Sequence, residues 1–185
     1  MIEGNIPPHI GNLTNLIFLN LSGNLLNGII PPLGSLAKLE RLDLGNNRLE
    51  GNISNQFELL QGLGLLDISR NILSGNIPNS LASIKQLRRL ILHHNKLSGS
   101  IPASLGNYIN LELLDLSHNM LTGSIPREIA KLSNLQFYLN LSWDLLDGLL
   151  PLEIGKIAMA QAIDISSNQL TRVISPTLGS YNRLQ

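Results

Sequence analysis

A leucine period of about 24 residues constrains the fold of this chain more than any other feature of its sequence. Residues 111–134 read LELLDLSHNMLTGSIPREIAKLSN, which gives the template LxxLxLxxNxLxGxIPxxIxxLxx. Six further segments follow this template, the first two and last two with changes: 16–38, 39–62, 63–86, 87–110, 135–159 and 160–183. A fixed period of about 20–29 residues indicates a solenoid, in which each repeat buries its apolar face only against its neighbours.

The alternating leucines at the start of each repeat predict a short β-strand with one buried face. In the template repeat, Leu114 and Leu116 should point inward, whereas Leu113 and Asp115 should point outward. The apolar pair in the second half of each repeat predicts a short 3₁₀ or helical turn on the opposite wall of the core. We therefore expect residues 1–185 to form a single α/β solenoid, a right-handed β-α superhelix of about seven coils of 23–25 residues with a parallel concave sheet.

An asparagine recurs at the ninth template position. It is Asn24, Asn47, Asn71, Asn95, Asn119 and Asn168, and Asp144 takes its place once. The turn after each strand leaves backbone N–H and C=O groups inside the coil, and a buried polar group without a partner costs about 1–3 kcal/mol. Because an amide side chain both donates and accepts, a ladder of asparagines can satisfy these groups coil after coil. An ionised Asp144 cannot donate, so we expect its coil to be the weakest.

The spacing of this ladder is not uniform. The first two asparagines are 23 residues apart and the middle ones 24, whereas Asn119 and Asp144 are 25 apart. The extra residue lies within residues 135–139, where we expect a bulge or a locally displaced coil. In the last repeat Arg172 replaces the template glycine and Ser175 the proline. The middle coils should therefore be the most regular.

The glycine-x-isoleucine-proline part of the template makes the pattern specific. It occurs at residues 75–78, 99–102 and 123–126, and residues 51–54 carry serine in place of the proline. In this it resembles the plant-type leucine-rich repeat, found in the ectodomains of plant receptor-like kinases and in related receptor-like proteins. The resemblance covers essentially the whole chain. It implies extracellular recognition of a peptide or protein ligand, together with a co-receptor ectodomain of the same repeat type, at the outer face of the plasma membrane or in secreted form.

The composition and the two ends of the sequence indicate what kind of protein this repeat segment comes from. The chain has no cysteine, and its 13 basic residues balance 13 acidic ones. No basic stretch predicts binding to nucleic acid, and no apolar run reaches the ~18 residues of a membrane span. Residues 4–7 already carry repeat landmarks, and Leu184 falls where a next strand would begin. We therefore expect an uncapped solenoid segment of a receptor ectodomain that begins and ends in mid-repeat, with any membrane helix and kinase domain outside it.

Two alternatives to a receptor segment stay open. The first is a secreted inhibitor-type protein of the same repeat class, whose complete transcript would lack membrane and kinase segments. The second is a truncated, non-functional product, which would not fold as a monomer.

The outward strand positions line the concave face, which is the usual binding surface of a solenoid. Arginine mixed with apolar residues is typical of the side chains that dominate binding energy at protein interfaces. On this basis we predict that the ligand contacts Arg41, Leu65, Arg88, Arg89, Ile91, His93 and Leu113.

Catalysis and metal binding are weaker interpretations of the same face. The aspartates of the LDLS-like segments should hydrogen-bond locally rather than act as acid and base. His93, His94 and His118 are neighbours in the repeat pattern, but they lack a fixed second set of orienting groups for zinc or copper. No nucleotide-binding glycine loop with its lysine is present, so any kinase activity would belong to a domain outside this chain. We predict a non-enzymatic segment without cofactor or metal.

Four Asn-x-Ser/Thr sequons fit a secreted history. They begin at Asn12, Asn20, Asn52 and Asn140. Asn20 and Asn140 should lie on the concave face near its two ends. Sugars there would leave the coils between them open to a ligand.

Overall fold

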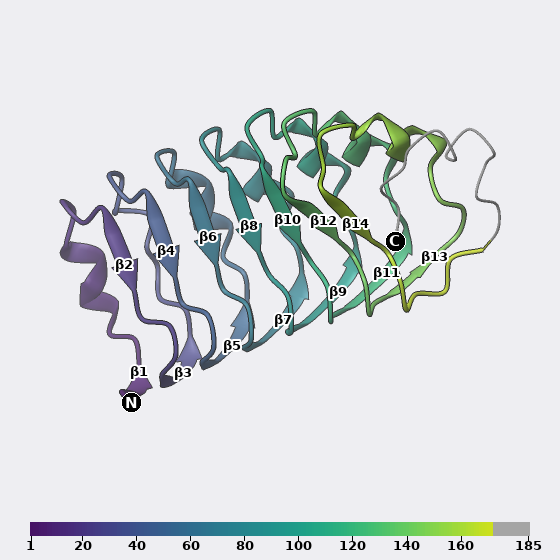
Figure 1. The fold of residues 1–185 in the computed structure, drawn as a ribbon. Helices are drawn as coiled ribbons and strands as arrows, with labels where there is room; N and C mark the ends of the chain where they lie inside the picture. Colours follow the sequence, from purple (N-terminus) through teal and green to yellow (C-terminus); the bar gives the residue numbers. More distant parts are fainter. Residues whose placement is uncertain (172–185) are drawn as a thin grey trace.

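The computed structural model describes residues 1–171, and it confirms a leucine-rich-repeat solenoid. Successive coils lie side by side from the N-terminus onward, so that two sheets run along the described chain (Figure 1). The predicted irregularities at Arg172 and Ser175 lie outside the described residues. Every helix in the described part is a five-residue 3₁₀ turn, and none has the length and hydrophobicity to cross a bilayer.

The concave sheet is built from the LxL segments, as the period-two alternation predicts. Its strands are β2 (Phe18–Asn20), β4 (Arg41–Asp43), β6 (Leu65–Asp67), β8 (Arg89–Ile91), β10 (Leu113–Asp115), β12 (Tyr138–Asn140) and β14 (Ala162–Asp164). All neighbours pair in parallel, with Arg41 opposite Leu65 and Leu65 opposite Arg89. The inward leucines of the middle strands are completely buried.

A second parallel sheet was not predicted from the sequence. Its strands are β1 (Glu3–Asn5), β3 (Leu25–Ile29), β5 (Arg48–Asn52), β7 (Ile72–Asn76), β9 (Lys96–Ser100), β11 (Met120–Ser124) and β13 (Leu145–Asp147). The template glycine therefore lies within a strand, rather than only shaping a bend. Gly75 has a φ of +74°, and a Cβ there would lie 2.5 Å from the Asn52 Oδ1 of the previous coil. Both the backbone conformation and this close approach favour glycine.

Short 3₁₀ helices form the wall opposite the concave sheet. They are η1 (Pro8–Asn12), η2 (Asn55–Leu59), η3 (Asn79–Ser83), η4 (Ala103–Asn107), η5 (Arg127–Lys131) and η6 (Leu152–Lys156). The 23-residue coil has no such helix between β3 and β4. The extra residue of the 25-residue coil is accommodated just before β12. In the regular coils the residue before a strand and the first residue of the strand, such as Gly64 and Leu65, both donate to one carbonyl of the previous coil. Here Gln136 and Phe137, one residue earlier, donate to the Glu112 carbonyl, and the pairing of β10 with β12 begins only at Leu114 and Leu139. The predicted local irregularity is thus a one-residue shift of the hydrogen bonds at the start of one strand.

The core is a continuous column between these walls, mostly of leucine and isoleucine, and it includes the fully buried Phe57. Tyr108 is the one tyrosine in the core of residues 1–171, and its hydroxyl donates to the Leu81 carbonyl of the previous coil at 2.6 Å. Burial raises the pKa of this hydroxyl well above its usual value. A tyrosine can therefore replace an aliphatic residue here only because its polar end finds a backbone acceptor.

The ladder asparagines join each coil to the one before it. The Asn71 Oδ1 accepts the backbone N–H of Leu49 at 2.9 Å, and its Nδ2 donates to the carbonyls of Leu44, Ile68 and Ser69. The same acceptor bond, at 2.8–3.0 Å, recurs at the other five ladder asparagines. One side chain thus closes its own turn and bonds to the neighbouring coil.

Asp144 reproduces only half of this arrangement. Its Oδ1 accepts the Leu121 N–H at 2.9 Å, but its Oδ2 is buried without a hydrogen-bond partner. Burial raises the pKa of this carboxyl from 3.8 to about 7. The folded protein therefore holds a proton on Asp144 over a pH range in which the unfolded chain has lost it.

This linkage predicts a pH-dependent stability. Because the folded pKa lies above the unfolded value, the free energy of unfolding should fall as pH rises from about 4 to about 7. Asp144→Asn should remove most of this slope and add ~1–3 kcal/mol above about pH 7, because an amide can donate where the carboxylate cannot. Urea unfolding followed by the fluorescence of Trp143, the only tryptophan, measures both effects.

Asn119→Asp is the matched control. It places the same defect in the preceding coil, where the asparagine Nδ2 donates to Leu92, Leu116 and Ser117. It should produce a second pH-dependent loss of stability. Equal stability of the Asp144→Asn protein and the unmutated protein at all pH values would contradict this account of the ladder.

Candidate functional site

A groove of about 830 Å³ runs along the edge of the concave sheet where the strands begin. It crosses five coils, and its lining is Ile17, Lys38, Glu40, Arg41, Gly62, Gly64, Leu65, Gln86, Arg88, Arg89 and Glu112. Gly64 occupies the position that holds Glu40, Arg88 or Glu112 in neighbouring coils, and Gly62 the position of Lys38 or Gln86. These two glycines remove side chains from the part of the lining that the third coil contributes.

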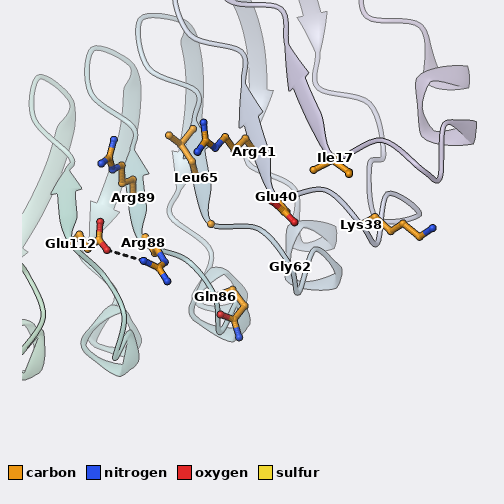
Figure 2. Close-up of a pocket in the computed structure, with 11 residues that line it drawn as sticks. Ile17, Lys38, Glu40, Arg41, Gly62, Leu65, Gln86, Arg88, Arg89 and Glu112 are labelled. Atoms are coloured by element: carbon orange, nitrogen blue, oxygen red, sulfur yellow. Dashed lines mark hydrogen bonds and ion pairs between the residues drawn. The ribbon is translucent and has the colours of Figure 1, made fainter.

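Four of the seven predicted contact residues line this groove: Arg41, Leu65, Arg88 and Arg89. Figure 2 shows Arg41, Leu65 and Arg89 on successive strands, facing the same side. Arg88 is different, because its Nη1 lies 3.2 Å from the Glu112 Oε1 in an ion pair across two coils. That pair is exposed and contributes little stability, but a ligand would have to compete with Glu112 for the Arg88 guanidinium.

Arg41 and Arg89 lie against aromatic rings instead. The Arg41 guanidinium lies 5.2 Å from the centre of the Phe18 ring, and the Arg89 guanidinium 5.1 Å from that of Phe137. A guanidinium held over a ring by a cation–π contact keeps its edge N–H groups available for a ligand. Neither arginine forms an ion pair with any residue that the structure describes.

Leu113 is placed differently from the prediction. Its position is on the outward side of β10, but only 8 % of the residue is exposed. The reason is that Arg89 of β8 reaches Phe137, which precedes β12, and so crosses over the strand between them. Leu113 lines a smaller hollow of about 240 Å³ with Arg89, Phe137, Tyr138, Gln161 and Ala162.

Ile91 and His93 are half-buried and line neither hollow. They lie further along their coil, towards the rim where the chain leaves the concave sheet. There the His93 Nδ1 is 2.9 Å from the His94 Nδ1. The structure therefore separates the predicted set: four residues line the groove, Leu113 lines the smaller hollow, and Ile91 and His93 lie towards the rim.

The rim carries a stack of rings that sequence reasoning did not foresee. The His94 and His118 rings stack with centroids 4.0 Å apart, and the Trp143 ring lies nearly parallel to His118 at 5.4 Å. All three residues have φ near +55°, which turns their side chains to the same side. Burial, helped by His118 and Arg70, lowers the pKa of His94. The signal in the sequence was three ring side chains at one template position in consecutive coils.

The outward aspartates and asparagines are engaged locally. The Asp67 Oδ1 accepts the backbone N–H and the hydroxyl of Ser69, at 2.9 and 2.6 Å, and Asp115 does the same with Ser117. These bonds fix the turn after the strand. Within residues 1–171 no group of three or more histidines and carboxylates is arranged to hold a metal ion.

The four sequons have different surroundings. Asn12, at the end of η1, and Asn52, at the end of β5, are exposed and lie away from the concave face. Asn20 and Asn140 lie on the concave sheet, and each accepts the N–H and hydroxyl of the serine two residues later. Asn20 is exposed, whereas Asn140 is half-buried between two paired strands.

These surroundings predict unequal glycosylation if the chain passes through a secretory pathway. Asn12 and Asn52 should carry glycans in most molecules, because both residues are exposed and lie outside the concave sheet. Asn140 should be the least occupied site in the folded protein. Glycopeptide mass spectrometry of the secreted chain measures all four, and high occupancy at Asn140 in correctly folded material would contradict this order.

Comparisons with known proteins identify the same type of repeat. Family models described as leucine-rich repeats match residues 14–58, 37–97 and 110–132. Together these matches cover more than half of the chain. Receptor-like protein CLAVATA2 of Arabidopsis thaliana is 41% identical over 53 residues, which are 29% of this chain and 7% of that protein.

Solved structures extend the likeness over nearly the whole chain. The leucine-rich-repeat ectodomain of the Arabidopsis thaliana membrane receptor kinase GASSHO1/SCHENGEN3, in complex with CASPARIAN STRIP INTEGRITY FACTOR 2, superposes with a TM-score of 0.95 at 35% identity. The match covers 98% of this chain and 22% of that ectodomain chain. The Arabidopsis receptor kinase HAESA, in complex with the peptide hormone IDA and the co-receptor SERK1, matches with a TM-score of 0.87 at 37% identity, covering 91% of this chain and 28% of that one.

This chain thus spans about a quarter of these two solved ectodomains and a smaller part of the curated receptor-like protein. The repeat template, the two parallel sheets and the relatives all agree. The chain belongs to the leucine-rich-repeat family, in the plant type that forms the ectodomains of receptor-like kinases and receptor-like proteins.

Proposed function

We propose that this chain is a ligand-recognition segment of a plant receptor ectodomain, and that it binds a peptide or protein ligand along its concave face. The observation that carries the proposal is the groove across five coils, which is lined by Arg41, Leu65 and Arg89 together with backbone exposed at two glycines. A long, partly charged groove suits an extended chain better than a compact small molecule. The surface supports ligand recognition better than it supports catalysis.

The relatives support the same class of partner. The structures of two similar ectodomains are complexes with CASPARIAN STRIP INTEGRITY FACTOR 2 and with the peptide hormone IDA, the latter together with the co-receptor SERK1. We propose by analogy that this chain acts outside the cell, at the outer face of the plasma membrane or in secreted form. A co-receptor ectodomain would then be a second partner.

Selection from a displayed library of random peptides on the secreted, immobilised chain tests this function. Leu65→Glu should weaken binding of the selected peptides by about tenfold or more, because the new carboxylate fills the groove and pairs with the flanking arginines. Titration of labelled peptides, followed by fluorescence anisotropy, gives the change in Kd.

Ile72→Glu is the matched control, because Ile72 is an exposed residue of the second sheet and receives the same new charge. Its affinity for the selected peptides should not change. Peptides that bind both variants equally well, or a library that yields no binders, would contradict a ligand site on the concave face.

A further inference from the structure

Within the proposed ligand-recognition function, the geometry points to a specific kind of ligand. We propose that the groove binds an acidic peptide in the polyproline II conformation, with two carboxylate side chains three residues apart. One carboxylate pairs with Arg41 and the other with Arg89. This inference rests on the proposed function, and it adds the conformation and the charge spacing of the ligand.

The spacing of the two arginines selects the conformation. Arg41 and Arg89 occupy the same register on β4 and β8, with Leu65 of β6 between them. Two strand spacings of about 4.8 Å separate their backbones by about 9.6 Å. In a polyproline II helix, residues i and i+3 lie on the same face about 9.3 Å apart. In a β-strand, residues i and i+3 face opposite sides, so an extended β-peptide cannot present both carboxylates together.

The charge of the groove selects acidic side chains. Its lining contains four cations, Lys38, Arg41, Arg88 and Arg89, against the two carboxylates Glu40 and Glu112. Glu112 is paired with Arg88. The two arginines without an acidic partner among the described residues are therefore the ones at the i and i+3 spacing. Because each is held on an aromatic ring, little side-chain freedom is lost when it binds a carboxylate.

The residues around the two arginines fix the position of the ligand. Leu65 lies between them and offers an apolar contact to the ring of a proline at i+1 or i+2. At the next outward position, two residues further along the strands, lie Asp43 and Asp67. Their Oδ1 atoms accept the backbone N–H groups of Gly45 and Ser69 in the turns that follow. These carboxylates repel an acidic peptide that moves away from the edge of the sheet. An acidic ligand is thereby confined to the line of the arginines.

Synthetic peptides of defined spacing test the proposal. The probe is fluorescein-labelled Pro-Pro-Glu-Pro-Pro-Glu-Pro-Pro, in which the proline residues favour polyproline II and the glutamates stand at i and i+3. The comparison peptides have the glutamates at i and i+2, or glutamine at both positions. Anisotropy titration with the full chain should show binding of the i, i+3 peptide at least about tenfold tighter than either comparison peptide.

Two variants of the protein assign that binding to the arginines. Arg41→Gln and Arg89→Gln should each weaken the i, i+3 peptide by about tenfold and reduce the salt dependence of its binding. Arg48→Gln is the matched control, since Arg48 is an exposed arginine on the second sheet. Circular dichroism of each variant verifies that the fold is retained.

The outcomes separate this inference from the proposed function. Equal affinity for all three synthetic peptides, with library-selected peptides still sensitive to Leu65→Glu, would overturn the acidic polyproline II ligand and leave the recognition function standing. Binding of the i, i+3 peptide that is unchanged in both arginine variants would also overturn it. Failure of the synthetic and the selected peptides alike would overturn both.

Discussion

The turn that follows each concave strand is the constraint on which the rest of this solenoid depends. There the chain leaves one sheet for the other with its backbone groups turned into the coil. One asparagine amide, such as that of Asn71, closes its own turn and accepts an N–H from the previous coil. Because no coil can bury its apolar face alone, this shared bond couples the register of one coil to that of the next. Asp144 shows what the coupling needs, since a carboxylate in the same place leaves one oxygen unpartnered.

A scaffold this repetitive leaves the outward positions free to vary, and the candidate site comes from departures in those positions. Gly62 and Gly64 line the groove at positions where neighbouring coils carry long polar side chains. Phe137, inserted before β12, receives the Arg89 guanidinium. Arg89 lines both the groove and the smaller hollow, which Leu113 and Phe137 also line. The residues that follow the template thus build the surface, and those that depart from it determine its shape and its charge.

The predicted ligand residues show which features of the concave face can be predicted from a repeat template. Reading outward positions by register placed Arg41, Leu65 and Arg89 on one line, and the strand pairing places them there. Register alone could not show that Arg88 is occupied by Glu112, because this pairing depends on the reach of two long side chains across two coils. Nor could it show the ring stack at the rim, where the left-handed backbone of each turn decides the direction of the side chain.

The sequence by itself determined the solenoid, the concave sheet and the asparagine ladder. Each of these follows from a local rule, period-two burial or a polar group that needs a partner, repeated at a fixed interval. Only the tertiary structure decided that the glycine-containing segments pair into a second sheet, since strand pairing is a relation between coils and Gly75 is read equally well as a bend. It also decided which outward side chains remain open to a ligand. The physical reason is that long side chains reach across one or two strand spacings, and the coils they meet lie 24 or 48 residues away in the sequence.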